Sequence, residues 1–135
     1  MQVKINSSKF EKKEKIYSET DFDFYEILNK EINIPYLART SVKSIYDFFK
    51  NEIINLQNEI EIISLLKHPS INKFVSYSFK FFDKKQHPTI ITEFCSNGTL
   101  SQILSKNEII LDNTKKLIII YGIASGMSYL HSHNI

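Results

Sequence analysis

A regular apolar stripe between residues 49 and 66 constrains the fold of this chain more than any other feature of its sequence. Apolar side chains recur there in steps of four and three, the spacing that places them along one face of an α-helix of about five turns; they are Phe49, Ile53, Leu56, Ile60, Ile63 and Leu66. Asp47 precedes the stripe, where a carboxylate favours a helix N-terminus. The helix is expected to end at His68-Pro69, because the residue before a proline is disfavoured in the helical conformation. Such a helix needs an apolar surface to cover.

Short strands are expected before this helix. From Ile16 to Ile45, short apolar stretches alternate with polar ones, and Pro35 is expected at a strand start or a sheet edge. Residues 1–15 are polar and lysine-rich with glutamates interleaved. Because this run is short and mixed in sign, we expect a solvated polar lead-in and not an arm that binds nucleic acid.

A hairpin and two further helices are expected after the long helix. Apolar and polar residues alternate from Val75 to Phe81, a polar turn spans 83–88, and a second strand is expected over 89–94. A short helix at 100–104 follows, and Asp112 can cap the start of a longer one. This order predicts an α+β fold in which a small antiparallel sheet is followed by helices gathered at the C-terminal end.

The charge balance and the cysteine count exclude several classes of protein. Seventeen basic and 15 acidic residues give a net charge of +2, which is too balanced for a nucleic-acid or membrane-surface protein. Cys95 is the only cysteine, so an internal disulfide and a cysteine-based zinc site are excluded, and a cytoplasmic, intracellular setting is the simplest expectation. No apolar run approaches the roughly 18 residues needed to span a bilayer. No metal site is expected, because His131 and His133 lack a third ligand in the sequence nearby.

Three stretches resemble eukaryotic protein kinases in their residues, order and separation. Residues 58–71, NEIEIISLLKHPSI, resemble the kinase helix αC and the segment after it. Residues 90–100, IITEFCSNGTL, resemble the strand before the hinge, the hinge and the start of helix αD. Residues 123–135, IASGMSYLHSHNI, resemble the end of helix αE. Among kinases, these three stretches most resemble the tyrosine-kinase-like and related serine/threonine kinases.

The resemblance implies a partial kinase domain over residues 16–135. Residues 16–95 would form the N-lobe, with its antiparallel sheet and helix αC, and the hinge. Residues 96–135 would supply helices αD and αE of a truncated C-lobe. In the full-length protein such a domain would transfer the γ-phosphoryl group of ATP, held with Mg²⁺, to serine or threonine of a protein substrate, or alternatively to tyrosine.

The resemblance also assigns a pair of charged residues. In kinases a strand lysine holds the α- and β-phosphates and a glutamate of helix αC pairs with it. Glu59 is the glutamate by this resemblance, and Lys43 is the lysine, in the run Thr-Ser-Val-Lys. The competing register places Arg39 there, which would put bulky Leu37 where a small residue leaves room for adenine. Arginine is also a poor substitute for a compact ammonium, so we favour Lys43 and keep Arg39 as the alternative.

The hinge residues implied by the resemblance act mainly through their backbone. The carbonyl of Glu93 and the amide of Cys95 would bind the adenine edge of ATP. Thr92 would be the gatekeeper at the back of the pocket, and Leu100 would pack beneath the adenine.

Two departures from the kinase pattern weigh against activity of this chain. No glycine precedes Gly98, although kinases cover the phosphates with a glycine-rich loop, and the equivalent region at 16–27 carries carboxylates. The chain ends at Ile135, before any H-R-D or D-F-G motif. We therefore expect weak or no ATP binding and no catalysis by this chain. A pseudokinase-like regulatory module with protein partners is the alternative to a piece of an active kinase, and an unrelated α+β interaction domain is a third hypothesis.

Overall fold

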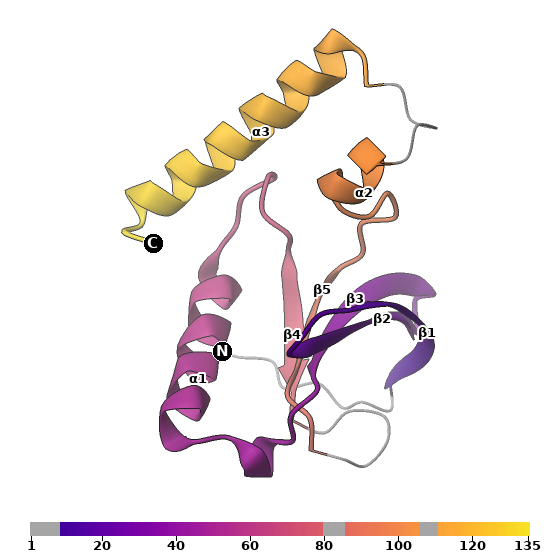
Figure 1. Ribbon diagram of the computed structural model, residues 1–135, viewed down its shortest axis with the longest axis vertical. Helices are drawn as coiled ribbons and strands as arrows, with labels where there is room; N and C mark the ends of the chain where they lie inside the picture. The colour runs from indigo at the N-terminus through magenta and orange to yellow at the C-terminus, as the bar shows by residue number, and fades with distance from the viewer. Residues whose placement is uncertain (1–8, 80–85, 106–110) are drawn as a thin grey trace. The chain divides into compact units, whose positions relative to one another are not determined.

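The computed structural model describes residues 9–79, 86–105 and 111–135, which form two compact units (Figure 1). The first, the sheet unit, comprises the described residues through Leu66 together with Lys73–Phe94. The second, the helical unit, comprises Lys67–Asn72 and Cys95–Ile135.

A five-stranded antiparallel sheet with the strand order β1-β2-β3-β5-β4 is the frame of the sheet unit. Its strands are β1 (Phe10–Ser18), β2 (Phe22–Asn29), β3 (Ile34–Ser41), β4 (Phe74–Ser78) and β5 (Thr89–Glu93). The predicted α+β class and the predicted β4–β5 hairpin are confirmed, although the strand end expected at Phe81 lies outside the described residues. Pro35 is exposed at the second position of β3, where a missing N–H costs the sheet little.

Strand β1 begins at Phe10, inside the segment predicted to be a polar lead-in. Phe10 is buried and meets the Tyr36 ring edge-on at 5.9 Å between centroids. The rest of the strand is largely exposed, and it pairs with β2 through the backbone with two irregularities in register. An edge strand held in this way needs no apolar alternation, which is why the lysine-rich sequence gave no strand signal.

Helix α1 (Lys50–Leu65) confirms the helix predicted from the apolar stripe. A short 3₁₀ helix, η2 (Ile45–Asp47), precedes it, in a region where the sequence suggested a further strand. Ile60 is the buried residue of α1, and the helix contacts β4 of the sheet (Figure 1). After Leu66 the backbone turns extended, in agreement with the expected end before His68-Pro69.

The two faces of the sheet have different neighbours. The apolar core on one face is built from Phe10, Ile27, Ala38 and Ile91, with Tyr25, Tyr36 and Val75 packed against it. Since successive residues of a strand point to opposite faces, the neighbours Arg39 and Ile90, which are cross-strand partners, point to the other face. This second face carries the candidate site.

The helical unit contains α2 (Leu100–Ser105) and α3 (Asn113–Ser132). Asp112 caps α3 as predicted, because its Oδ1 accepts a 2.8 Å hydrogen bond from the backbone N–H of Lys115. The segment Lys67–Asn72 contacts α3, where the Lys67 N–H donates to the Tyr129 hydroxyl at 3.1 Å. In the described part of the chain, no helix combines the length and apolarity that crossing a bilayer requires.

Candidate functional site

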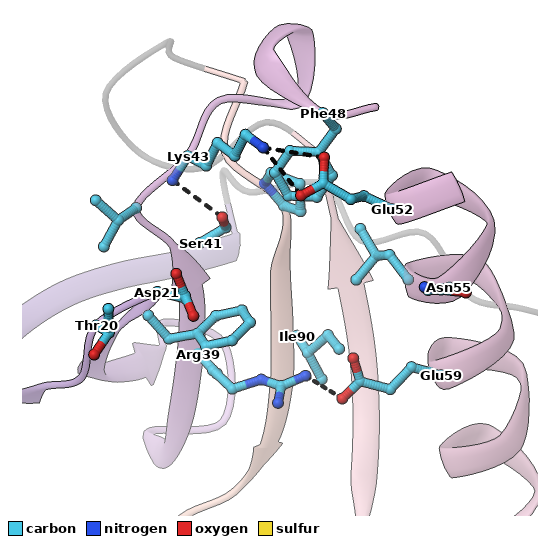
Figure 2. Close-up of a pocket in the computed structure, with 14 residues that line it drawn as sticks. Thr20, Asp21, Arg39, Ser41, Lys43, Phe48, Glu52, Asn55, Glu59 and Ile90 are labelled. Atoms are coloured by element: carbon cyan, nitrogen blue, oxygen red, sulfur yellow. Dashed lines mark hydrogen bonds and ion pairs between the residues drawn. The ribbon is translucent and has the colours of Figure 1, made fainter. Parts of the chain in front are cut away.

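An ion pair joins Arg39 of β3 to Glu59 of α1 (Figure 2). The guanidinium Nη2 donates to Oε1 of the carboxylate, and both side chains are about one-third exposed (29% and 39%). The Arg39 guanidinium carbon also lies 4.6 Å from the centre of the Phe22 ring, a cation–π contact. The strand, the helix and the start of β2 thus all fix the position of this cation.

A second ion pair joins Lys43 to Glu52, near the start of α1. The Lys43 ammonium donates to both carboxylate oxygens at 3.0 Å. Glu52 also accepts a 2.6 Å hydrogen bond from the backbone N–H of Phe49, which closes the first turn of the helix. This backbone hydrogen bond, followed by the hydrogen bond from Lys43, holds the pKa of Glu52 below its usual value.

The structure differs from the favoured expectation that Lys43 pairs with Glu59. Strand β3 ends at Ser41, so Lys43 lies beyond it and faces the first turn of α1, where it meets Glu52. Arg39, the alternative, is the β3 cation that reaches Glu59. Sequence reasoning missed Glu52 altogether, although its position seven residues before Glu59 on the predicted helix was a usable signal.

A cavity of about 610 Å³ lies between these two ion pairs and the turn that joins β1 to β2. Its charged lining comprises Arg39, Lys43, Glu52, Glu59 and Asp21, and its apolar lining comprises Phe22, Val42, Phe48, Leu56, Pro88 and Ile90. Figure 2 shows Asp21 on the strand side of the cavity and the two glutamates on the helix side. From the sequence, residues 16–27 were recognised only as acidic and free of glycine. The position of Asp21 beside the two cations was not predicted.

The turn between β1 and β2 is short and engaged in its own hydrogen bonds. The backbone N–H of Glu19 donates to the carbonyl of Phe22 at 2.8 Å. The carbonyl of Asp21 accepts from the N–H of Val42 at 3.0 Å, which ties the turn to the end of β3. The carboxylate of Asp21 makes no ion pair with any residue that the structure describes.

Two of the expected hinge residues, Thr92 and Glu93, end strand β5 in the sheet unit. Thr92 is half-buried, and its hydroxyl donates to the Glu93 carbonyl at 3.3 Å. Glu93 is exposed, and its side chain accepts from the N–H of Lys73 at 2.7 Å. Their roles toward adenine stay predictions.

The other two expected hinge residues, Cys95 and Leu100, belong to the helical unit. The exposed Cys95 thiol donates to the Asn72 side-chain oxygen at 3.2 Å. Leu100 begins α2 and is 38% exposed. Their roles also stay predictions. Over the residues that the structure describes, no group of three or more histidine, cysteine or acidic side chains could hold a metal ion.

The sequence profile of the family described as protein tyrosine and serine/threonine kinase matches residues 34–135, more than half of the chain. The chain belongs to the protein kinase family. Strand β3, helix α1 and the hairpin of this kinase chain all lie inside the matched range.

Two curated relatives are much longer than this chain. Dual specificity protein kinase zak2 of Dictyostelium discoideum is 29% identical over 141 residues, which covers 99% of this chain and 21% of zak2. Dual specificity protein kinase zakA of the same organism is 35% identical over 80 residues, which covers 58% of this chain and 10% of zakA. The kinase chain therefore spans about a fifth or less of these relatives.

The kinase fold is also shared with a solved structure, that of a pseudokinase in its apo form. The two superpose with a TM-score of 0.77 at 22% identity, over 87% of this chain and 42% of that one. At this identity the likeness concerns the fold alone.

Protein kinases use ATP and Mg²⁺, but the residues around the cavity do not fit the phosphates. Each lining cation that the structure describes already has a carboxylate partner, Arg39 with Glu59 and Lys43 with Glu52. Asp21 adds a third carboxylate to the lining. A phosphate entering here would meet the like charge of these carboxylates.

Proposed function

We propose that this chain is a pseudokinase-like module that uses the kinase fold for binding and regulation and does not transfer phosphoryl groups from Mg·ATP. The observation that carries the proposal is the charge of the cavity lining, in which the carboxylates of Asp21, Glu52 and Glu59 outnumber the two cations. Positioning and charge neutralisation around the phosphates are the main tasks of a kinase site, so a cavity with surplus negative charge lacks the chief requirement.

Two further features support the proposal. Leu37 lies two residues before Arg39 and therefore on the same face of β3, where the family pattern has a small residue beside adenine. The β1–β2 turn has no glycine, so its backbone cannot approach phosphate oxygens as closely as a glycine-rich loop does. The partners of such a module would be proteins. The single cysteine, Cys95, supports a cytoplasmic setting.

A second candidate function, ATP-dependent phosphoryl transfer by the longer protein to serine, threonine or tyrosine, is favoured by one observation. The β3 cation and a glutamate of α1 are already paired, and active kinases require such a pair. An arginine in this role offers a planar fork in place of a compact ammonium, which favours the first candidate.

A thermal-shift titration with Mg·ATP tests the proposal. A ligand with a Kd of about 0.1 mM would, at about 10 mM, stabilise the fold by about 2.7 kcal/mol, which corresponds to a rise of roughly 10 °C in a domain of this size. We expect no dose-dependent rise. A saturable rise that is lost in Glu59→Gln would support the second candidate and contradict the first.

A further inference from the structure

The cavity on the helix side of the sheet has the size and the apolar body of a small-molecule site. Its volume of about 610 Å³ falls within the range of pockets that hold small organic ligands. Two aromatic rings, Phe22 and Phe48, and the aliphatic side chains of Leu56 and Ile90 form much of the apolar lining. All of these residues belong to the sheet unit, so the cavity is complete within that unit.

The charged side chains that line the cavity carry one more negative than positive formal charge. Two cations, Arg39 and Lys43, stand against three carboxylates, Asp21, Glu52 and Glu59, for a formal sum of −1. Glu59 and Glu52 are each committed to one cation. Asp21 is the surplus carboxylate, since none of the described lysines, arginines or histidines forms an ion pair with it.

A hydrogen bond holds the backbone of Asp21 in place. Its carbonyl accepts from the N–H of Val42 at 3.0 Å, and this bond holds the β1–β2 turn against the end of β3. Asp21 is exposed and lines one wall of the cavity, and the helix with Glu52 and Glu59 forms the opposite wall (Figure 2). A ligand lying between the two walls meets a carboxylate with which no cation in the described part of the chain forms an ion pair.

The aromatic rings of the lining already attract cations. The guanidinium carbon of Arg39 lies 4.6 Å from the centre of the Phe22 ring, and the Lys43 ammonium lies 5.4 Å from that of Phe48. Ring faces carry negative charge density and favour cationic groups. Both contacts are made by cations of the lining itself, so the preference for a cationic ligand rests on the formal charge of −1.

We propose that this cavity binds a small organic cation, namely a protonated amine or a guanidinium on an aromatic or aliphatic body, with Asp21 as its counter-ion. The inference rests on the proposed function, because it requires that Mg·ATP does not occupy the cavity. The body of the ligand would pack on Phe22, Leu56 and Ile90, while its cationic end would pair with Asp21.

Three probes of matched shape test the charge preference: 2-phenylethylamine, 2-phenylethanol and 3-phenylpropionate. Each is titrated into the full ¹⁵N-labelled chain, and affinities are taken from backbone amide shifts. We expect shifts at 20–22, 39–43 and 52–59, and an amine affinity about fivefold above that of the alcohol, as a partly exposed ion pair provides. Equal affinities, tighter binding of the carboxylate or no binding of the amine would overturn the inference.

Two variants separate the role of Asp21 from a general effect of charge. Asp21→Asn should lower the amine affinity about fivefold, to that of the alcohol, and leave the alcohol unchanged. Asp47→Asn is the matched control, because Asp47 lies in η2 and outside the cavity lining, and it should change neither affinity. An unchanged amine affinity in Asp21→Asn would also overturn the inference.

A parallel titration with Mg·ATP distinguishes failure of this inference from failure of the proposed function. Saturable binding of Mg·ATP at 39–43 would contradict the proposed function, and the inference would fail with it. Absence of both amine and Mg·ATP binding would overturn the inference alone.

Discussion

Glu52 and Glu59 lie seven residues apart on α1, and each carboxylate pairs with a different cation from the neighbouring strand and its extension. Seven residues are close to two helical turns, so both side chains leave the same side of the helix. Ile60 is the fully buried residue of α1, and Ile53, Leu56 and Ile63 are partly buried. The ion pairs of Glu52 and Glu59 add contacts from two places along the helix to β3 and the residues after it.

The Arg39–Glu59 ion pair should show measurable coupling in a double-mutant cycle. With Arg39→Met and Glu59→Gln, we predict a coupling free energy of about 0.2–1 kcal/mol, because both side chains are about one-third exposed. Urea denaturation of the four proteins measures it. The same cycle with Lys43→Met in place of Arg39→Met is the control and should give no coupling, since Lys43 pairs with Glu52.

Acid should weaken the attachment of the start of α1. The pKa of Glu52 is lowered by the Phe49 N–H and then by Lys43, so the stabilisation is present above the ordinary glutamate pKa of about 4.3 and is lost as pH falls through the lower folded-state pKa. Hydrogen exchange at the amides of Phe49 and Ile53, which donate to Glu52 and to the Phe49 carbonyl, should therefore lose protection below about pH 4.3. In Glu52→Gln this acid-induced step should vanish; a step of unchanged size would contradict the assignment.

The carboxylate of Asp112 should stabilise the start of α3. Asp112→Ala removes the acceptor for the Lys115 N–H and should lower the helicity of the chain, measured by circular dichroism. Asp112→Asn is the matched control, because an asparagine oxygen caps a helix about as well. Equal loss in both variants would point to the charge and not to the cap.

Local patterns were enough to predict much of the fold. The apolar stripe predicted α1 because helical periodicity depends on residues that are close together in the sequence. Asp112 was predicted as a cap because capping likewise involves residues within one helical turn. Strand β1 was missed because it is held by backbone pairing to β2, while only Phe10 is buried.

The choice between Arg39 and Lys43 could not be settled by local patterns. It depends on where β3 ends relative to α1, which is fixed by the pairing of Arg39 with Ile90 on a strand far away in sequence. The size of Leu37 argued against the Arg39 register only on the assumption that adenine must fit beside it. The position of Asp21 beside the cavity depends in the same way on the contact between the β1–β2 turn and Val42.

The core on the far face of the sheet should tolerate truncation poorly. Ile27 is fully buried, and Ile27→Ala should lower the free energy of unfolding by about 2–5 kcal/mol through lost burial and a residual cavity. Ile32→Ala is the matched control, since Ile32 is 54% exposed and should lose much less. Chemical denaturation measures both, and similar losses would contradict the described sheet.

Isothermal titration calorimetry with Mg·ATP is the most direct test of whether the carboxylates around the cavity keep phosphate out. We predict no saturable heat with the wild-type chain, and a gain of Mg·ATP or tripolyphosphate binding in the Glu52→Gln/Glu59→Gln double variant, in which the formal charge of the lining changes from −1 to +1. Saturable submillimolar binding of Mg·ATP by the wild-type chain, lost in Arg39→Met, would contradict it.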